Sequence, residues 1–66
     1  MKNRIKVARA EKSMTQQQLA DAAGVSRQTI NAIESGKFVP STILALKIAQ
    51  IFEKQVEEIF QLDDED

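Results

Sequence analysis

The sequence predicts a compact all-α domain of five short helices, and three observations support this fold class. Apolar residues recur at the three- and four-residue spacing of helix faces through most of the 66 residues. The hydroxyl side chains of Thr15, Ser26 and Ser41, which can cap helix starts, precede three of the apolar segments. Gly24 and Gly36 follow two of them, where a helix can end in a left-handed conformation.

The composition restricts the kinds of site that the chain can hold. It has no Cys and no His, which excludes disulfides, Cys/His zinc sites, thiol nucleophiles and His general bases. The carboxylates lie mostly in the tail or on helix faces, and there is no glycine-rich phosphate-binding loop. We therefore expect no enzyme activity, no catalytic residue, no metal, no cofactor and no small-molecule effector site.

The distribution of apolar residues also bears on where the protein acts. No stretch approaches the roughly 20 apolar residues that span a bilayer. The basic N-terminal residues are not followed by the long apolar run of a signal peptide. We expect a soluble cytoplasmic protein with no membrane partner.

The two halves of the chain carry opposite charge. Residues 1–37 hold seven basic and three acidic residues, a net charge of +4, whereas residues 38–66 hold two basic and seven acidic ones, a net charge of −5. Affinity for a duplex depends on the local basic surface that displaces counterions, not on the whole-chain sum of −1. Because such asymmetry also arises by chance in small proteins, it supports a polyanionic partner only together with other features.

The first helix is expected over residues 2–12. Ile5, Ala8, Arg9 and Lys12 share one face at helical spacing. Arginine is unusual on an inward face, because a buried charge requires a partner. The sequence therefore predicts a specific partner for this side chain.

The second helix is expected over residues 16–23 and leads into a tight turn. Thr15 and Gln18 have the spacing of a capping box, in which each side chain bonds to the other's backbone amide. Gly24 ends the helix in the left-handed conformation that glycine adopts without steric cost. Val25 then fills the turn.

The third helix follows the turn, over residues 27–35, with Ser26 as its cap. Ile30 and Ile33 would face the core. The opposite side carries Arg27, Gln28, Asn31 and Ala32. Two short helices joined in this way, at about 16–35, are typical of a DNA-binding helix-turn-helix. The polar side of an isolated helix is more often merely solvated, but the preceding turn favours base reading.

The fourth helix, expected over residues 42–53, is apolar almost all round, as is typical of the buried centre of a fold. Pro40 holds the residue before it in extended geometry, and Ser41 can cap the helix. Lys47, Gln50 and Lys54 form a narrow polar stripe on this helix. Ile43 falls between Lys47 and Gln50 around the helix axis, so we expect it near the surface.

A short fifth helix and an acidic tail complete the chain. The helix is expected over residues 55–60, with Val56, Ile59 and Phe60 facing inward. Residues 63–66 are all acidic, have no means of burial and are expected to be disordered. We place one DNA-binding domain at residues 1–62. The tail either keeps the protein soluble or repels DNA from all but the basic face.

Several ordered motifs extend through the chain and together carry a family resemblance. They are Met14-Thr15-Gln16-Gln17-Gln18-Leu19-Ala20, Gly24-Val25-Ser26-Arg27-Gln28-Thr29-Ile30, Ile33-Glu34-Ser35-Gly36-Lys37, Pro40-Ser41, Leu46-Lys47-Ile48-Ala49 and Glu57-Glu58-Ile59-Phe60. Through them the chain closely resembles the lambda-repressor-like, Cro-like helix-turn-helix regulators (the xenobiotic-response-element family), which are small prokaryotic transcriptional regulators. The resemblance implies a compact five-helix DNA-binding domain.

The resemblance also implies roles for individual side chains. The base-reading positions are Arg27, Gln28, Asn31 and Ala32. The phosphate-contacting positions are Gln16, Gln17, Ser26, Thr29 and Lys37. Arginine can donate two hydrogen bonds to guanine, glutamine can pair with the edge of adenine, and the alanine methyl can touch thymine.

The resemblance supplies the partner that Arg9 requires. In relatives, an arginine at this position pairs with the glutamate that matches Glu34 and ties the first helix to the recognition helix. The alternative interpretation is that Arg9 is a further phosphate contact.

The chain departs from the family pattern at two places. Relatives commonly have glycine after the fourth helix, where this chain has Glu53-Lys54-Gln55, so the turn there could be longer or helical throughout. Relatives also commonly have a polar residue in place of Ile43, which suggests a subunit contact. The candidate residues of a homodimer interface are Ile43, Leu46, Ile51 and Leu62. Dimers of this family read an inverted repeat with recognition helices about 34 Å apart.

The sequence thus predicts a sequence-specific regulator of transcription that binds double-stranded DNA. We expect it to be a repressor, associated with the nucleoid when bound to an inverted-repeat operator. The alternative is an antitoxin or protein-interaction module of the same fold that binds DNA only secondarily. Antitoxins of this family often carry an extra neutralising tail, whereas only four acidic residues follow Leu62 here.

Overall fold

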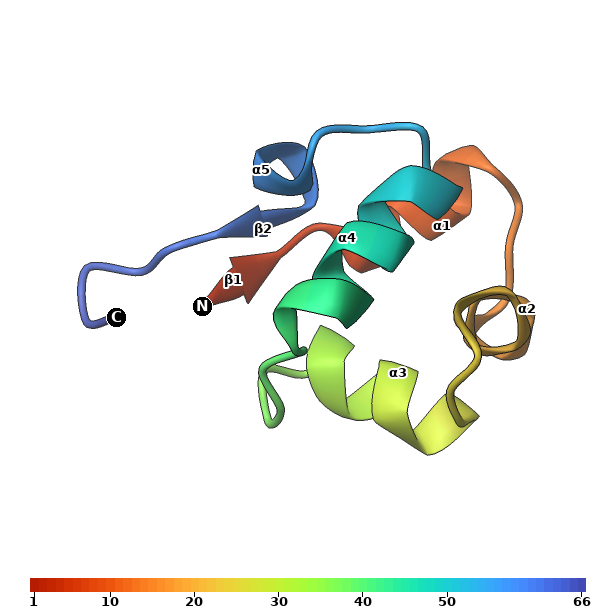
Figure 1. Cartoon of the computed structure of the whole chain (residues 1–66), viewed down its shortest axis with the longest axis horizontal. Coiled ribbons are helices and arrows are strands. Elements are labelled where there is room, and N and C mark those ends of the chain that lie inside the picture. Colours follow the sequence, from red (N-terminus) through yellow and green to blue (C-terminus); the bar gives the residue numbers. More distant parts are fainter.

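Five helices succeed one another in the computed structural model, which describes residues 1–66 (Figure 1). The elements, in chain order, are β1 (Lys2–Asn3), α1 (Ile5–Glu11), α2 (Gln16–Ala23), α3 (Arg27–Glu34), α4 (Thr42–Ile51), α5 (Val56–Ile59) and β2 (Phe60–Gln61). In Figure 1, α4 crosses the middle of the molecule, with α3 below it, α2 to its right and α5 to its upper left. The five-helix architecture is confirmed.

A two-stranded antiparallel sheet joins the two ends of the chain, which the helical patterning did not predict. Lys2–Asn3 pairs with Phe60–Gln61, and the backbone N–H of Arg4 donates to the carbonyl of Ile59 at 2.8 Å. The first helix therefore begins at Ile5 rather than at residue 2, and the fifth ends one residue before the expected 60. Pairing across the chain satisfies these backbone groups better than a fraying helix end. The helix prediction is therefore corrected at Lys2, Asn3 and Phe60, while the all-α fold class holds for the rest of the domain.

The core combines apolar residues from all five helices. The buried side chains of the cluster are Ile5, Ala8, Leu19, Ala20, Ala23, Ile30, Ile33, Ile48, Ala49, Phe52, Ile59 and Phe60. Val25, in the turn after α2, is half-buried and packs against them. α2 packs on both α3 and α4, so this core fixes the angle at which α3 is presented.

The predicted helix starts are confirmed in atomic detail. The Thr15 hydroxyl accepts from the backbone N–H of Gln18 at 3.0 Å, and the Gln18 side chain accepts from the backbone N–H of Thr15 at 2.8 Å. The Ser26 hydroxyl accepts from the amide of Thr29 at 3.1 Å. Ser41 caps α4 in the same way, also at 3.1 Å. Each cap satisfies one of the amides that have no partner inside a helix.

The first four helices share one way of ending. After each of them one residue adopts a left-handed conformation: Ser13 (φ 52°), Gly24 (φ 76°), Gly36 (φ 80°) and Glu53 (φ 57°). The next amide in each case donates to the carbonyl five residues back, at 2.9–3.0 Å, which completes a Schellman motif. The turn after α4 is therefore neither longer nor helical throughout, as the missing glycine had suggested, because Glu53 itself takes the left-handed position.

Replacing the non-glycine residue at such an end is expected to stabilise the fold. Ser13→Gly removes a left-handed conformation that costs an L-residue about 1–2 kcal/mol, while the greater freedom of unfolded glycine offsets about 0.5–1 kcal/mol. The Ser13 side chain makes no hydrogen bond in the chain, so little else is lost. We expect the free energy of unfolding to rise by about 0.5–1 kcal/mol in urea denaturation.

Gly24→Ala is the matched control for this substitution and should have the opposite effect. A Cβ atom at Gly24 would meet nothing within 4 Å, so the cost is purely conformational. We expect a loss of about 1 kcal/mol. If Ser13→Gly destabilised the protein, the left-handed strain assigned to Ser13 would be wrong.

Candidate nucleic-acid interface

The α3 helix presents one side to the core and leaves the other uncovered. Ile30 and Ile33 are buried, and α3 lies along the edge of the molecule with no element beyond it (Figure 1). On the outward side Arg27, Gln28 and Asn31 are exposed, and Ala32 is half-buried. The three polar side chains predicted to read bases thus share one accessible surface at the start and middle of α3.

The hydroxyl groups at the start of α3 are engaged within the chain. The side-chain oxygens of Ser26 and Thr29 lie 3.0 Å apart, in addition to the capping bond between the Ser26 hydroxyl and the Thr29 amide. On α2, the Gln17 side-chain nitrogen donates to Asp21 at 2.9 Å. Lys37, in the loop after α3, is exposed, and its ammonium group has no partner. The proposed phosphate contacts thus lie at the start of α2, at the start of α3 and in the loop after α3, and Lys37 is the one charged residue among them.

Arg9 and Glu34 form a bidentate ion pair that joins α1 to the end of α3. Arg9 Nε donates to Glu34 Oε2 at 2.7 Å, and Arg9 Nη2 donates to Oε1 at 3.1 Å. Arg9 Nη1 donates to the carbonyl of Met14 at 2.9 Å, so all three guanidinium nitrogens are bonded. Both side chains are largely covered, with exposed fractions of 15% and 8%. The hydrogen bond to Glu34 raises the pKa of Arg9 against the opposing effect of burial.

Three further hydrogen bonds hold the same region and were not predicted. Gln16 Nε2, at the start of α2, lies 3.4 Å from Glu34 Oε1 and 3.3 Å from Asn31 Oδ1. Asn3 Nδ2, on β1, donates to the carbonyl of Ile33 at 2.9 Å. No local pattern indicates the Asn3 bond, because it joins residues 30 positions apart. Together with the ion pair, these bonds tie α3 to three other elements.

Comparison with known proteins assigns this geometry to a family. The helix-turn-helix family model matches residues 5–59, which is most of the chain. The chain belongs to the helix-turn-helix family. The match confirms the resemblance to lambda-repressor-like, Cro-like regulators, and it places the chain among DNA-binding transcriptional regulators.

The sequence matches to individual relatives cover the whole helix-turn-helix chain or nearly so. A transcriptional regulator of the helix-turn-helix type from Methanocaldococcus jannaschii is 52% identical over 66 residues, which is 100% of both chains. YgzD from Bacillus subtilis, described in the same way, is 46% identical over 65 residues, 98% of each chain. Among solved structures, the restriction-modification controller protein C.AhdI from Aeromonas hydrophila superimposes with a TM-score of 0.78 at 27% identity, over 85% of each chain.

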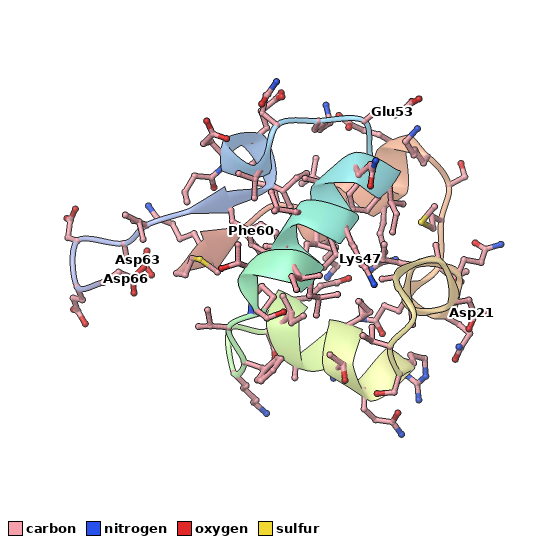
Figure 2. All side chains as sticks on the ribbon, viewed as in Figure 1. Asp21, Lys47, Glu53, Phe60, Asp63 and Asp66 are labelled. Carbon is pink, nitrogen blue, oxygen red and sulfur yellow. The ribbon has the colours of Figure 1, made fainter.

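The acidic tail of this helix-turn-helix domain lies far from α2. Asp63 and Asp66 stand together at one end of the molecule, and Asp21 on α2 stands at the other (Figure 2). The amino group of Met1 lies 3.0 Å from Asp63 Oδ2 and 2.9 Å from Asp66 Oδ2. The hydrogen bond to Asp66 is the main cause that raises the pKa of this amine. A hydrogen bond from the Asp63 backbone is the main cause that lowers the pKa of the Asp66 carboxyl. The domain boundary at residue 62 stays a prediction.

Several large apolar side chains outside the core are exposed. Ile43 is 69% exposed and Leu46 53%, and Leu62, after β2, is 77% exposed. Ile51 differs from the other three interface candidates because it is half-buried and packs against the core. The loop before α4 adds exposed Phe38 and Val39, which the sequence did not single out as interface residues. No helix in the structure combines the length and apolarity that crossing a bilayer requires.

Proposed function

We propose that this chain regulates transcription by binding a specific sequence of double-stranded DNA in the cytoplasm, with α3 in the major groove. The observation that carries the proposal is the uncovered side of α3, where Arg27, Gln28 and Asn31 stand exposed on a helix tied to three other elements. A major groove admits one α-helix, and rigid attachment of that helix favours selection among bases. The simplest activity is repression, because bound protein can block a promoter without any further domain.

The side chains on this surface match different base edges. Arg27, in the first turn of α3, can donate two hydrogen bonds to guanine O6 and N7, and Gln28 can pair with the edge of adenine. The methyl group of Ala32 can contact the thymine methyl but can neither donate nor accept. Asn31 has the least predictable preference, because its amide can either donate or accept.

Phosphate contacts would hold the domain in register on the duplex. The start of α2, at Gln16 and Gln17, offers backbone amides that have no partner inside the helix, and the helix dipole favours an anion there. Ser26 and Thr29 stand at the equivalent end of α3. Lys37 supplies a positive charge in the loop beyond the other end of α3. These contacts give affinity but no preference among sequences.

A homodimer would complete the binding unit. Ile43 and Leu46 are exposed one helical turn apart on α4, and Leu62 is exposed after β2; a second copy could cover these apolar side chains around a two-fold axis. Such a dimer would read an inverted repeat with its two recognition helices about one helical turn, 34–36 Å, apart. Ile51 contributes less than the other candidates, since the core already covers part of it.

The dimer is tested by light scattering at tens of micromolar. We expect the unaltered chain to give twice the mass of one chain, and Ile43→Asp to give the mass of one chain, because a carboxylate buried in an apolar interface would lack a partner. Val7→Asp is the control, since Val7 is also exposed but lies on α1 beside Arg4 and Lys54. A monomer mass for the unaltered chain would contradict the interface.

Selection of bound sequences from a random duplex pool tests the function itself. We expect an enriched inverted repeat and an affinity that falls as the salt concentration rises. Undetectable or salt-insensitive duplex binding would overturn the proposal. The alternative, an antitoxin or protein-interaction module, would use the same apolar side chains for a different chain, and it would be indicated by a second protein that co-purifies in a fixed ratio.

A further inference from the structure

One side chain connects the ion pair to the base-reading surface. The Gln16 amide lies between Glu34, which is bonded to Arg9, and Asn31, which is exposed on α3. Its nitrogen lies 3.4 Å from Glu34 Oε1 and 3.3 Å from Asn31 Oδ1. The outward-facing part of Asn31 therefore depends on a residue of another helix.

The charged groups at the buried end of this series of contacts decide which atoms donate and which accept. The Glu34 carboxylate, held by Arg9, can only accept hydrogen bonds, so the Gln16 side chain must turn its nitrogen toward it. The second proton on that nitrogen is then directed to Asn31, whose side-chain oxygen accepts the hydrogen bond. Asn31 Nδ2 has no partner in the chain and is left to face outward as a donor of two protons.

We propose that Gln16 is a positioning residue that fixes the orientation of the Asn31 amide, so that its nitrogen is the donor presented to the major groove. The inference rests on the proposed function, because it concerns how the same surface selects bases. A donor selects an acceptor on the base edge, as found on guanine, on thymine O4 and on adenine N7, and it rejects the exposed amino group of cytosine. The Asn31 oxygen keeps a second lone pair, so the two-bond pairing with adenine stays open, but only in the one orientation of the amide that Gln16 sets.

The same bonds change the role assigned to Gln16 itself. Both protons of its side-chain nitrogen are committed, so its side chain has no donor left for a phosphate oxygen. A phosphate at the start of α2 would therefore be bound by the backbone N–H groups rather than by this side chain. Gln16 acts on specificity through Asn31 and does not itself read a base.

The test measures base preference at the operator position that Asn31→Ala leaves unselective. Gln16→Met keeps the length of the side chain and removes its amide, so Asn31 is free to turn over. We expect the preference against cytosine at that position to fall about fivefold to tenfold, the effect of one hydrogen bond. Gln17→Met is the matched control: its side chain bonds to Asp21, and a phosphate contact at Gln17 carries no base preference, so the ratio among the four base pairs should not change whatever happens to the affinity.

A second variant tests the orientation without disturbing the contact to Gln16. Asn31→Asp keeps the oxygen that accepts from Gln16 but replaces the outward donor with an acceptor. We expect the preferred base at this position to change to cytosine, whose amino group donates to a carboxylate. The readout is the ratio among the four base pairs, because the added negative charge lowers affinity for every duplex alike.

The outcomes separate this inference from the function on which it rests. If the unaltered chain selects an inverted repeat but Gln16→Met and Gln17→Met share its base preferences, the positioning role is wrong and the function stands. An Asn31→Asp variant that keeps the original base would likewise overturn the donor orientation. If the unaltered chain shows no base preference at all, the proposed function fails and the inference fails with it.

Discussion

Arg9→Ala is expected to lower the free energy of unfolding by about 3 kcal/mol, the typical effect of removing one partner from a covered ion pair. The substitution leaves the Glu34 carboxylate, only 8% exposed, without its two charge-assisted bonds. It also frees the carbonyl of Met14, to which Arg9 donates. For a domain of this size the melting temperature should fall by about 10–20 °C, which thermal unfolding followed by circular dichroism would measure.

An exposed ion pair elsewhere in the fold provides the control for this prediction. Lys12 lies 3.3 Å from Glu53, whose side chain is 81% exposed, and such surface pairs contribute little. Lys12→Ala should therefore change the stability by about 0.5 kcal/mol or less. If Arg9→Ala kept the melting temperature of the unaltered chain but lost DNA affinity, Arg9 would be a phosphate contact rather than a structural partner.

The features that could be predicted from sequence are those set by neighbouring residues. The capping box of Thr15 and Gln18, the left-handed turn at Gly24 and the inward positions of Ile30 and Ile33 all follow from spacing within one or two helical turns. The resemblance to a known family then joined Arg9 to Glu34, 25 residues away. The helical spacing indicates that Arg9 faces inward and needs a partner, but it does not identify Glu34 as that partner.

The features that escaped prediction depend on residues far apart in the chain. β1 pairs with β2, a strand almost 60 residues later. The bond from Asn3 to the carbonyl of Ile33 joins β1 to α3. The left-handed conformations of Ser13 and Glu53 escaped for a different reason: a glycine normally marks such a position, and here the backbone bonds hold an ordinary residue in it.

The candidate site shows the same division. The exposure of Arg27, Gln28 and Asn31 follows from the helical period of α3, whereas the contact from Gln16 to Asn31 depends on the angle between two helices. That angle is set by packing in the core and cannot be read from either helix alone. The base preference of Asn31 therefore depends on the orientation of its amide, which the residue type alone does not reveal.

Arg27→Ala is expected to relax the selection of guanine at one operator position by about 1–3 kcal/mol, with other positions unchanged. Arg27 is exposed in the first turn of α3, and its guanidinium makes no bond within the chain, so its donors are free for a base. For the same reason its removal should not lower the melting temperature. Competition binding against all four base pairs at each position of the selected operator would measure the effect.

Lys37→Ala is the matched control, because it removes one positive charge from the other end of α3 without removing a base contact. It should weaken binding to every duplex by a similar factor and reduce the slope of log affinity against log salt by about 1. Arg27→Ala should instead change the ratio among base pairs more than the affinity for random DNA. If the two variants gave the same uniform loss, Arg27 would bind phosphate, and base selection would have to lie with Gln28 and the Asn31 amide that Gln16 orients.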